Sequence, residues 1–170
     1  MKHLLATLAA LGATAALSGC GFTPLHAAPS GTATFSQLGV SVGDGKDEND
    51  RAAGFMLRQH MLDRTGNPVE PRYTLDIRPS VRQVGLGLTG QDRASRFDSL
   101  LEARWELRDT ADGAVVDKGR VRSKATFSAD RDPYRLLTTS NAAVERVSRE
   151  VADDILAEVA LAIAEQRRAP

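Results

Sequence analysis

The stretch from Arg93 to Asp109 reads RASRFDSLLEARWELRD and alternates apolar with polar residues along most of its length. One set of alternate positions is apolar and comprises Phe97, Leu101, Ala103, Trp105 and Leu107. The other set is charged and comprises Arg96, Asp98, Glu102, Arg104, Glu106 and Arg108. A period of two residues is typical of a β-strand with one buried and one polar side. The stretch therefore predicts a long strand that packs against another layer on one face only.

The segments on either side continue this alternation. Asp112-Gly113 is a strong hairpin signal, so Val115–Ser128 is predicted as the next strand. Its expected inward residues are Val115, Val121, Ala125 and Phe127. Before the central stretch, Arg72–Val84 is predicted as a strand whose inward residues are Tyr73, Leu75, Ile77 and Val81.

Proline and glycine add detail to this earlier strand. Pro79 lies inside it and predicts an edge strand or a bulge, because proline has no N–H to donate. Three glycines follow the strand and predict a flexible hairpin tip: Gly85, Gly87 and Gly90.

One further strand and two helices complete the pattern. Thr34–Val42 alternates as a strand, and acidic residues then open a helix that ends before Gly66-Asn67-Pro68. An apolar stripe predicts a last helix from Pro133 to Arg168, with residues 138–141 as a candidate break. The expected fold class is α/β (α+β), a two-layer sandwich in which two helices cover one face of a four-stranded, mostly antiparallel sheet. We expect one such domain over residues 33–168.

The composition excludes several classes of function. The 170 residues carry 22 basic and 22 acidic side chains, whereas generic nucleic-acid binding needs a basic surface. The single cysteine excludes an internal disulfide and a cysteine-based metal cluster. No nucleophile, phosphate-loop or metal-ligand motif is present; His60 and Trp105 are expected to pack, and Asp153-Asp154 to be solvated. We therefore expect a non-enzymatic protein with no cofactor, no metal and no nucleic-acid partner.

The amino terminus predicts a lipid anchor. The apolar run from Leu4 to Leu17 is too short to span a bilayer but fits a secretory signal, so residues 1–19 are predicted as a leader. The run ends in Leu17, Ser18, Gly19 and Cys20, which resembles the lipobox of bacterial lipoproteins at all four positions. Cys20 is the expected lipidation site, and residues 20–32 are the expected tether. Because Gly21 is not an acidic retention signal, the expected address is the outer membrane, lipid-anchored, on the periplasmic side.

The polar faces of the three central strands are unusually basic. Ten basic side chains share them with only four acidic ones in a chain that is neutral as a whole. The basic set is Arg72, Arg78, Arg82, Arg96, Arg104, Arg108, Lys118, Arg120, Arg122 and Lys124. This face is either a solvated surface with cross-strand ion pairs or a docking surface for phosphate or an acidic partner. Lys118, Arg120, Arg122 and Lys124 favour docking, because no acidic residue among them balances their charge.

A family resemblance joins these features. The lipobox followed by Cys20-Gly21-Phe22-Thr23-Pro24-Leu25, and the order strand–helix–three strands–helix, resemble LptE, the lipopolysaccharide-assembly lipoprotein, in its alphaproteobacterial form. The resemblance implies a plug that helps to assemble the β-barrel LptD and assists lipopolysaccharide delivery to the outer leaflet. It also implies basic contacts for lipopolysaccharide near one hairpin tip and near the start of the last helix. The candidates in those regions are Arg93, Arg96, Arg131 and Arg135.

Two other hypotheses stay open at this point. The first is a free lipoprotein that faces the periplasm and binds an anionic ligand through the basic sheet face. The second is an unrecognised hydrolase, for which the sequence offers no cluster of titratable residues. Co-purification with a barrel distinguishes the plug from both.

Overall fold

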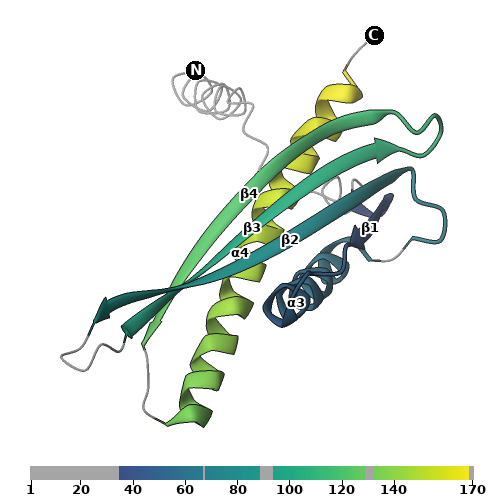
Figure 1. Cartoon of the computed structure of the whole chain (residues 1–170). Helices are drawn as coiled ribbons and strands as arrows, with labels where there is room; N and C mark the ends of the chain where they lie inside the picture. Colours follow the sequence, from purple (N-terminus) through teal and green to yellow (C-terminus); the bar gives the residue numbers. More distant parts are fainter. Residues whose placement is uncertain (1–34, 67, 89–93, 129–131, 169–170) are drawn as a thin grey trace, which may run out of the picture. The chain divides into compact units, whose positions relative to one another are not determined.

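A computed structural model describes residues 35–66, 68–88, 94–128 and 132–168. The predicted leader, Cys20 and the tether lie outside these residues. The described elements are, in order, β1 (Leu38–Val42), α3 (Glu48–Thr65), β2 (Tyr73–Leu88), β3 (Ala94–Asp109), β4 (Val115–Ser128) and α4 (Pro133–Gln166). Figure 1 shows the long strands β2–β4 running together, with α4 crossing them.

The sheet contains four strands in the order β1-β2-β3-β4. β1 pairs with β2 in parallel, because α3 carries the chain back to the start of the sheet between them. The pairs β2–β3 and β3–β4 are antiparallel. The expected fold, a mostly antiparallel four-stranded sheet with two helices, is confirmed.

Both helices pack on the same side of the sheet. α3 contacts β1 and β2, α4 contacts β3 and β4, and the two helices contact each other. The buried core between the layers includes Leu57 and Met61 from α3, Val151 and Ile155 from α4, and Leu107 from β3. Trp105 belongs to this core, as expected, and its Nε1 donates a hydrogen bond to Glu158 Oε2 on α4 at 2.9 Å.

Two expectations for α4 are wrong. The helix is continuous from Pro133 to Gln166, so residues 138–141 do not break it. Thr139 Oγ1 donates to the carbonyls of Arg135 and Leu136, so its hydroxyl is satisfied within the helix and not in a turn. Leu136 and Leu137 both belong to the apolar stripe that predicted the helix; Leu136 is partly buried and packs against the core, but Leu137 is 58% exposed.

β2 is longer than its glycines suggest. Gly85 pairs with Phe97 and Leu88 with Ala94, so the predicted flexible tip at Gly85 and Gly87 is strand. The third glycine, Gly90, lies outside the described residues. Pro79 lies beyond Ile77, the last β2 residue that pairs with β1, so it occupies an open edge of β2 as its missing N–H requires.

β4 has the predicted bounds but one wrong inward residue. Its register with β3 shifts between Leu107 and Arg108, and this irregularity follows the turn at Asp112-Gly113. As a result Val115 is 46% exposed, and Val116 packs against the core in its place. Further along, Phe97 and Phe127 stack with ring centroids 5.5 Å apart.

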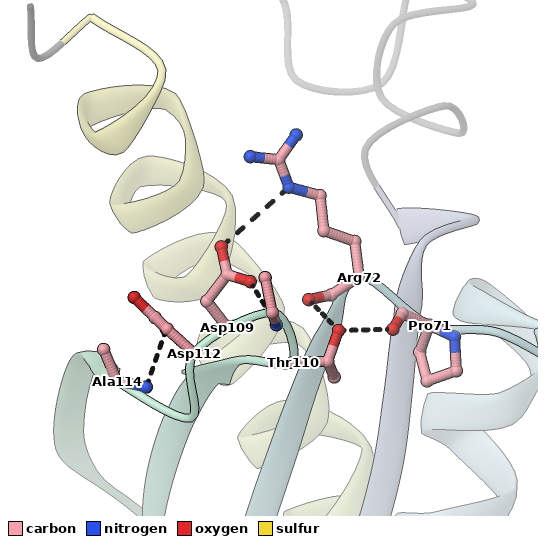
Figure 2. A network of polar contacts seen from close by, with 7 residues as sticks. Pro71, Arg72, Asp109, Thr110, Asp112 and Ala114 are labelled. Atoms are coloured by element: carbon pink, nitrogen blue, oxygen red, sulfur yellow. Dashed lines mark hydrogen bonds and ion pairs between the residues drawn. The ribbon is translucent and has the colours of Figure 1, made fainter.

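A polar network fixes the end of the sheet where β2 begins and β3 ends (Figure 2). Thr110 Oγ1 donates to the carbonyls of Pro71 and Arg72 at 2.9 and 2.8 Å, and Thr110 N donates to the Arg72 carbonyl at 2.9 Å. Asp109 Oδ1 accepts from Ala111 N, and Asp112 Oδ1 accepts from Ala114 N, both at 2.9 Å. These bonds satisfy backbone N–H and C=O groups of the turn and connect the start of β2 to the end of β3. In the described segments, no helix is long and apolar enough to cross a bilayer.

Candidate functional site

The candidate site is the outer face of the sheet, which we define as the side of β2–β4 that points away from α3 and α4. Strand alternation places charged side chains on this face, since the apolar ones point into the core. No described helix covers it, because both described helices pack on the opposite side.

Three arginines lie side by side in the middle of the outer face. Arg78 on β2 is the direct partner of Arg104 on β3, and Arg104 is the direct partner of Arg120 on β4. We call this set the arginine row. Direct cross-strand partners have Cβ atoms about 5 Å apart, and like charges there destabilise a sheet. The row therefore needs anionic groups nearby.

Glu102 supplies one such group. Its Oε1 lies 3.2 Å from Arg104 Nε and 3.6 Å from Arg120 Nε, and its Oε2 lies 2.8 Å from Arg122 Nε. Partial burial opposes ionisation of Glu102, but the hydrogen bond from Arg122 and the charges of all three arginines outweigh it and lower the pKa of the carboxyl. One carboxylate thus forms ion pairs with three guanidinium groups.

The arginine row borders an open concavity of about 820 Å³. Its lining comprises Asp76, Arg78, Arg104, Trp105, Glu106, Arg108, Lys118, Gly119, Arg120 and Arg122. Glu106 pairs with Arg108, whereas the side chains of Arg78 and Lys118 form no ion pair with any described residue. Six basic and two acidic side chains give the concavity a positive charge that suits oxyanions.

Farther from this concavity, charges on the outer face are better balanced. Asp98 accepts a hydrogen bond from Thr126 Oγ1 at 2.6 Å and lies 3.4 Å from Lys124 Nζ. The hydrogen bond from Thr126 lowers the pKa of Asp98, burial opposes this, and Lys124 adds to the lowering. Around Lys124, the interpretation of the face as a solvated surface with ion pairs therefore fits best.

The predicted site residues separate into three groups. Lys118, Arg120 and Arg122 line the concavity, while Lys124 lies next to them on β4. Arg96 is exposed on β3 opposite Ser128, beyond the Lys124 position, and Arg135 is exposed in the first turn of α4, on the helix layer. The predicted residues Leu17, Ser18, Gly19, Cys20, Arg93 and Arg131 lie outside the described residues.

Within the arginine row and its acidic neighbour, Arg78, Arg104 and Glu102 were not singled out as candidate contacts from the sequence. The alternation had placed all three on the polar face. What was missing was the register, which decides that the three row arginines are direct partners and that Glu102 lies beside them.

No family model and no curated protein sequence matches the chain. Solved structures do resemble it. A candidate lipoprotein from Caulobacter crescentus CB15 is 25% identical, with a TM-score of 0.62 over 81% of this chain and 98% of that chain. The rare lipoprotein B from Shewanella oneidensis is 15% identical, with a TM-score of 0.58 over 78% of this chain and 99% of that chain. An uncharacterised lipoprotein B from Nitrosomonas europaea is 13% identical, with a TM-score of 0.53 over 72% of this chain and 80% of that chain.

These neighbours support an LptE-like lipoprotein fold. At the two lower identities the likeness concerns the fold alone. The Caulobacter structure, at 25% identity, supports a lipoprotein.

Proposed function

We propose that the protein is a non-enzymatic outer-membrane lipoprotein that plugs an LptD-like β-barrel, helps to assemble it, and assists lipopolysaccharide delivery to the outer leaflet. The observation that carries this proposal is the charged outer face of the long strands β2–β4, which no described helix covers. The lumen of a large outer-membrane barrel is polar, so a domain inside it needs a polar surface toward the wall.

Both the sequence and the fold support the proposal. The LptE-like fold agrees with the resemblance carried by Cys20-Gly21-Phe22-Thr23-Pro24-Leu25. The alphaproteobacterial form of the family and the anchor at Cys20 remain predictions from these residues. Lipopolysaccharide carries phosphates, which match the basic concavity in charge.

A pull-down from native outer membranes tests this function. The tagged, lipidated chain is solubilised in a nonionic detergent, captured, and its partners are identified by mass spectrometry. The proposal expects one large β-barrel in a stoichiometric amount. A chain captured without any barrel would contradict it.

A free lipoprotein that binds an anionic ligand is the second candidate function. The observation that favours it is the open concavity, which lies within the size range of small-molecule sites. This hypothesis predicts that the captured chain is monomeric and that its affinity for an anion falls steeply with salt.

A further inference from the structure

The arginine row is costly for folding and only partly neutralised. Arg78, Arg104 and Arg120 are direct cross-strand partners, an arrangement of like charges that weakens strand pairing. Arg104 and Arg120 remain 66% and 49% exposed, so their guanidinium groups are accessible from solvent. The next row along the strands, Asp76, Glu106 and Lys118, places two acidic side chains and one basic side chain beside the arginine row.

Glu102 contacts the same nitrogen atom in each of its three arginines. The bonded nitrogen is Nε in Arg104, in Arg120 and in Arg122. Among the described residues, none accepts a hydrogen bond from the terminal Nη1 or Nη2 groups of these three arginines. These terminal groups are the donors that bind phosphate and carboxylate oxygens in a bidentate manner. Glu102 therefore contacts the guanidinium groups through Nε, and their terminal groups point to no hydrogen-bond acceptor among the described residues.

We propose that the arginine row, together with Arg122, is a binding site for phosphate groups and that Glu102 is its built-in counter-ion. In the unliganded protein, Glu102 neutralises part of the cluster and keeps the three Nε atoms together. A phosphate that enters the concavity binds the terminal nitrogens and competes with Glu102 for the same positive charge. Affinity is therefore set by two opposing contributions, donors from the arginines and repulsion from Glu102.

The shape and surroundings of the cluster favour a compact phosphate. The concavity is open on one side and about 820 Å³ in volume, which suits a phosphorylated headgroup or a free phosphate compound. The proposal rests on the proposed function only for the biological source of the phosphate, since the site itself follows from the arginines and Glu102.

The test measures inorganic pyrophosphate binding to the full-length, lipidated chain in nonionic detergent at low ionic strength, by isothermal titration calorimetry. Arg104→Gln and Arg120→Gln should each weaken binding about tenfold, the usual effect of losing a charge-assisted hydrogen bond. Glu102→Gln should strengthen binding several-fold, since it removes a competing charge without removing a donor.

Matched controls come from one ion pair on α4, Arg149–Glu145, at 2.8 Å. Arg149→Gln and Glu145→Gln change the net charge by the same amounts away from the sheet, and each should change affinity less than about twofold at this range. The proposal is overturned if the wild type does not bind pyrophosphate, if both row variants bind like wild type, or if Glu102→Gln and Glu145→Gln raise affinity equally. Thermal melting of each exposed-site variant verifies that it is folded.

A second titration with detergent-dispersed lipopolysaccharide identifies the source of the phosphate. If Arg104→Gln and Arg120→Gln lose affinity for both pyrophosphate and lipopolysaccharide, the phosphate belongs to a lipid headgroup. If they lose affinity for pyrophosphate alone, it belongs to a free phosphate compound. If pyrophosphate binds as expected but no barrel is captured from membranes, the phosphate site is supported and the plug function is contradicted.

Discussion

Asp50 on α3 and Val81 on β2 are 31 positions apart in the chain, yet Asp50 Oδ1 accepts a hydrogen bond from Val81 N at 2.6 Å. The contact lies where β2 continues past the end of β1, so the Val81 N–H has no strand partner on that side. Asp50 Oδ2 also accepts from Lys46 N at 3.2 Å, and Asp50 N donates to Asp47 Oδ1 at 2.8 Å. One buried carboxylate thus joins the start of α3 to the open edge of the sheet.

Replacing this carboxylate should destabilise the fold. Asp50→Ala leaves the buried Val81 N–H without an acceptor, which typically costs about 1–3 kcal/mol. The measurement is the free energy of unfolding from urea titration. Glu48→Ala, at an exposed position two residues earlier in the same helical turn, is the control and should lose well under 1 kcal/mol, roughly the strength of a helix-dipole contact. Equal losses would show that the bond to Val81 contributes nothing.

Gly119 leaves space for the indole of Trp105. A Cβ at position 119 would lie 2.7 Å from Trp105 Cε2 and Cζ2, so Gly119→Ala must displace the ring from its place against Glu158. Overpacking of this kind costs about 1–3 kcal/mol, and the single tryptophan reports it by a changed emission spectrum. Gly43→Ala is the control, because its Cβ would meet only ordinary contacts from 3.6 Å outward. An unchanged melting temperature and spectrum in Gly119→Ala would contradict this packing.

Lowering the pH should destabilise the folded protein through Glu102 and Asp98, two carboxylates of the outer face. Their pKa values in the folded protein are lowered below the ordinary 4.5 and 3.8, so the folded state binds fewer protons than the unfolded chain. Their stabilisation is complete above about pH 5 and is lost as the pH falls through the folded pKa values. Between about pH 6 and pH 3, the melting temperature of Glu102→Gln should therefore fall less than that of the wild type. If the melting temperatures of the wild type and of Glu102→Gln fall equally with pH, Glu102 does not contribute to the loss of stability in acid.

Cys20→Ser tests the lipid anchor. Without the thiol no diacylglycerol can be attached, so the variant should be unlipidated by mass spectrometry and should leave the outer-membrane fraction. Several acyl chains, each buried CH2 contributing about 0.8 kcal/mol, provide the membrane affinity that the variant loses. A Cys20→Ser protein that still fractionates with the outer membrane would disprove the lipobox assignment.

The alternating pattern was enough to predict the layers. Residues such as Leu101 and Leu107 point inward as expected, and β4 begins and ends at Val115 and Ser128 as predicted. Two-residue periodicity reports directly which face of a strand is buried, and the burial of apolar surface is the main driving force of folding. The same reasoning correctly placed Trp105 in the core.

The register could not be predicted in this way. Alternation decides only the face of a side chain, and sliding two strands by two residues leaves every face unchanged. At the turn Arg108 pairs with Val115, a register that would place Arg104 opposite Gly119, but the shift between Leu107 and Arg108 places it opposite Arg120. The arginine row and the Glu102 contacts depend on that shift. The Asp50–Val81 bond was missed because acidic residues at a helix start already had a sufficient explanation in the helix dipole.

The most direct test of the central claim, that the outer face docks against a barrel, is photo-cross-linking from Ser80 in intact cells. Ser80 is exposed on β2 opposite Glu102, so a photoreactive side chain there reports what covers the arginine row. The account predicts that light produces one major adduct, with a large outer-membrane β-barrel. A folded, membrane-bound Ser80 variant that gives no barrel adduct would contradict it and leave the outer face as a surface open to the periplasm.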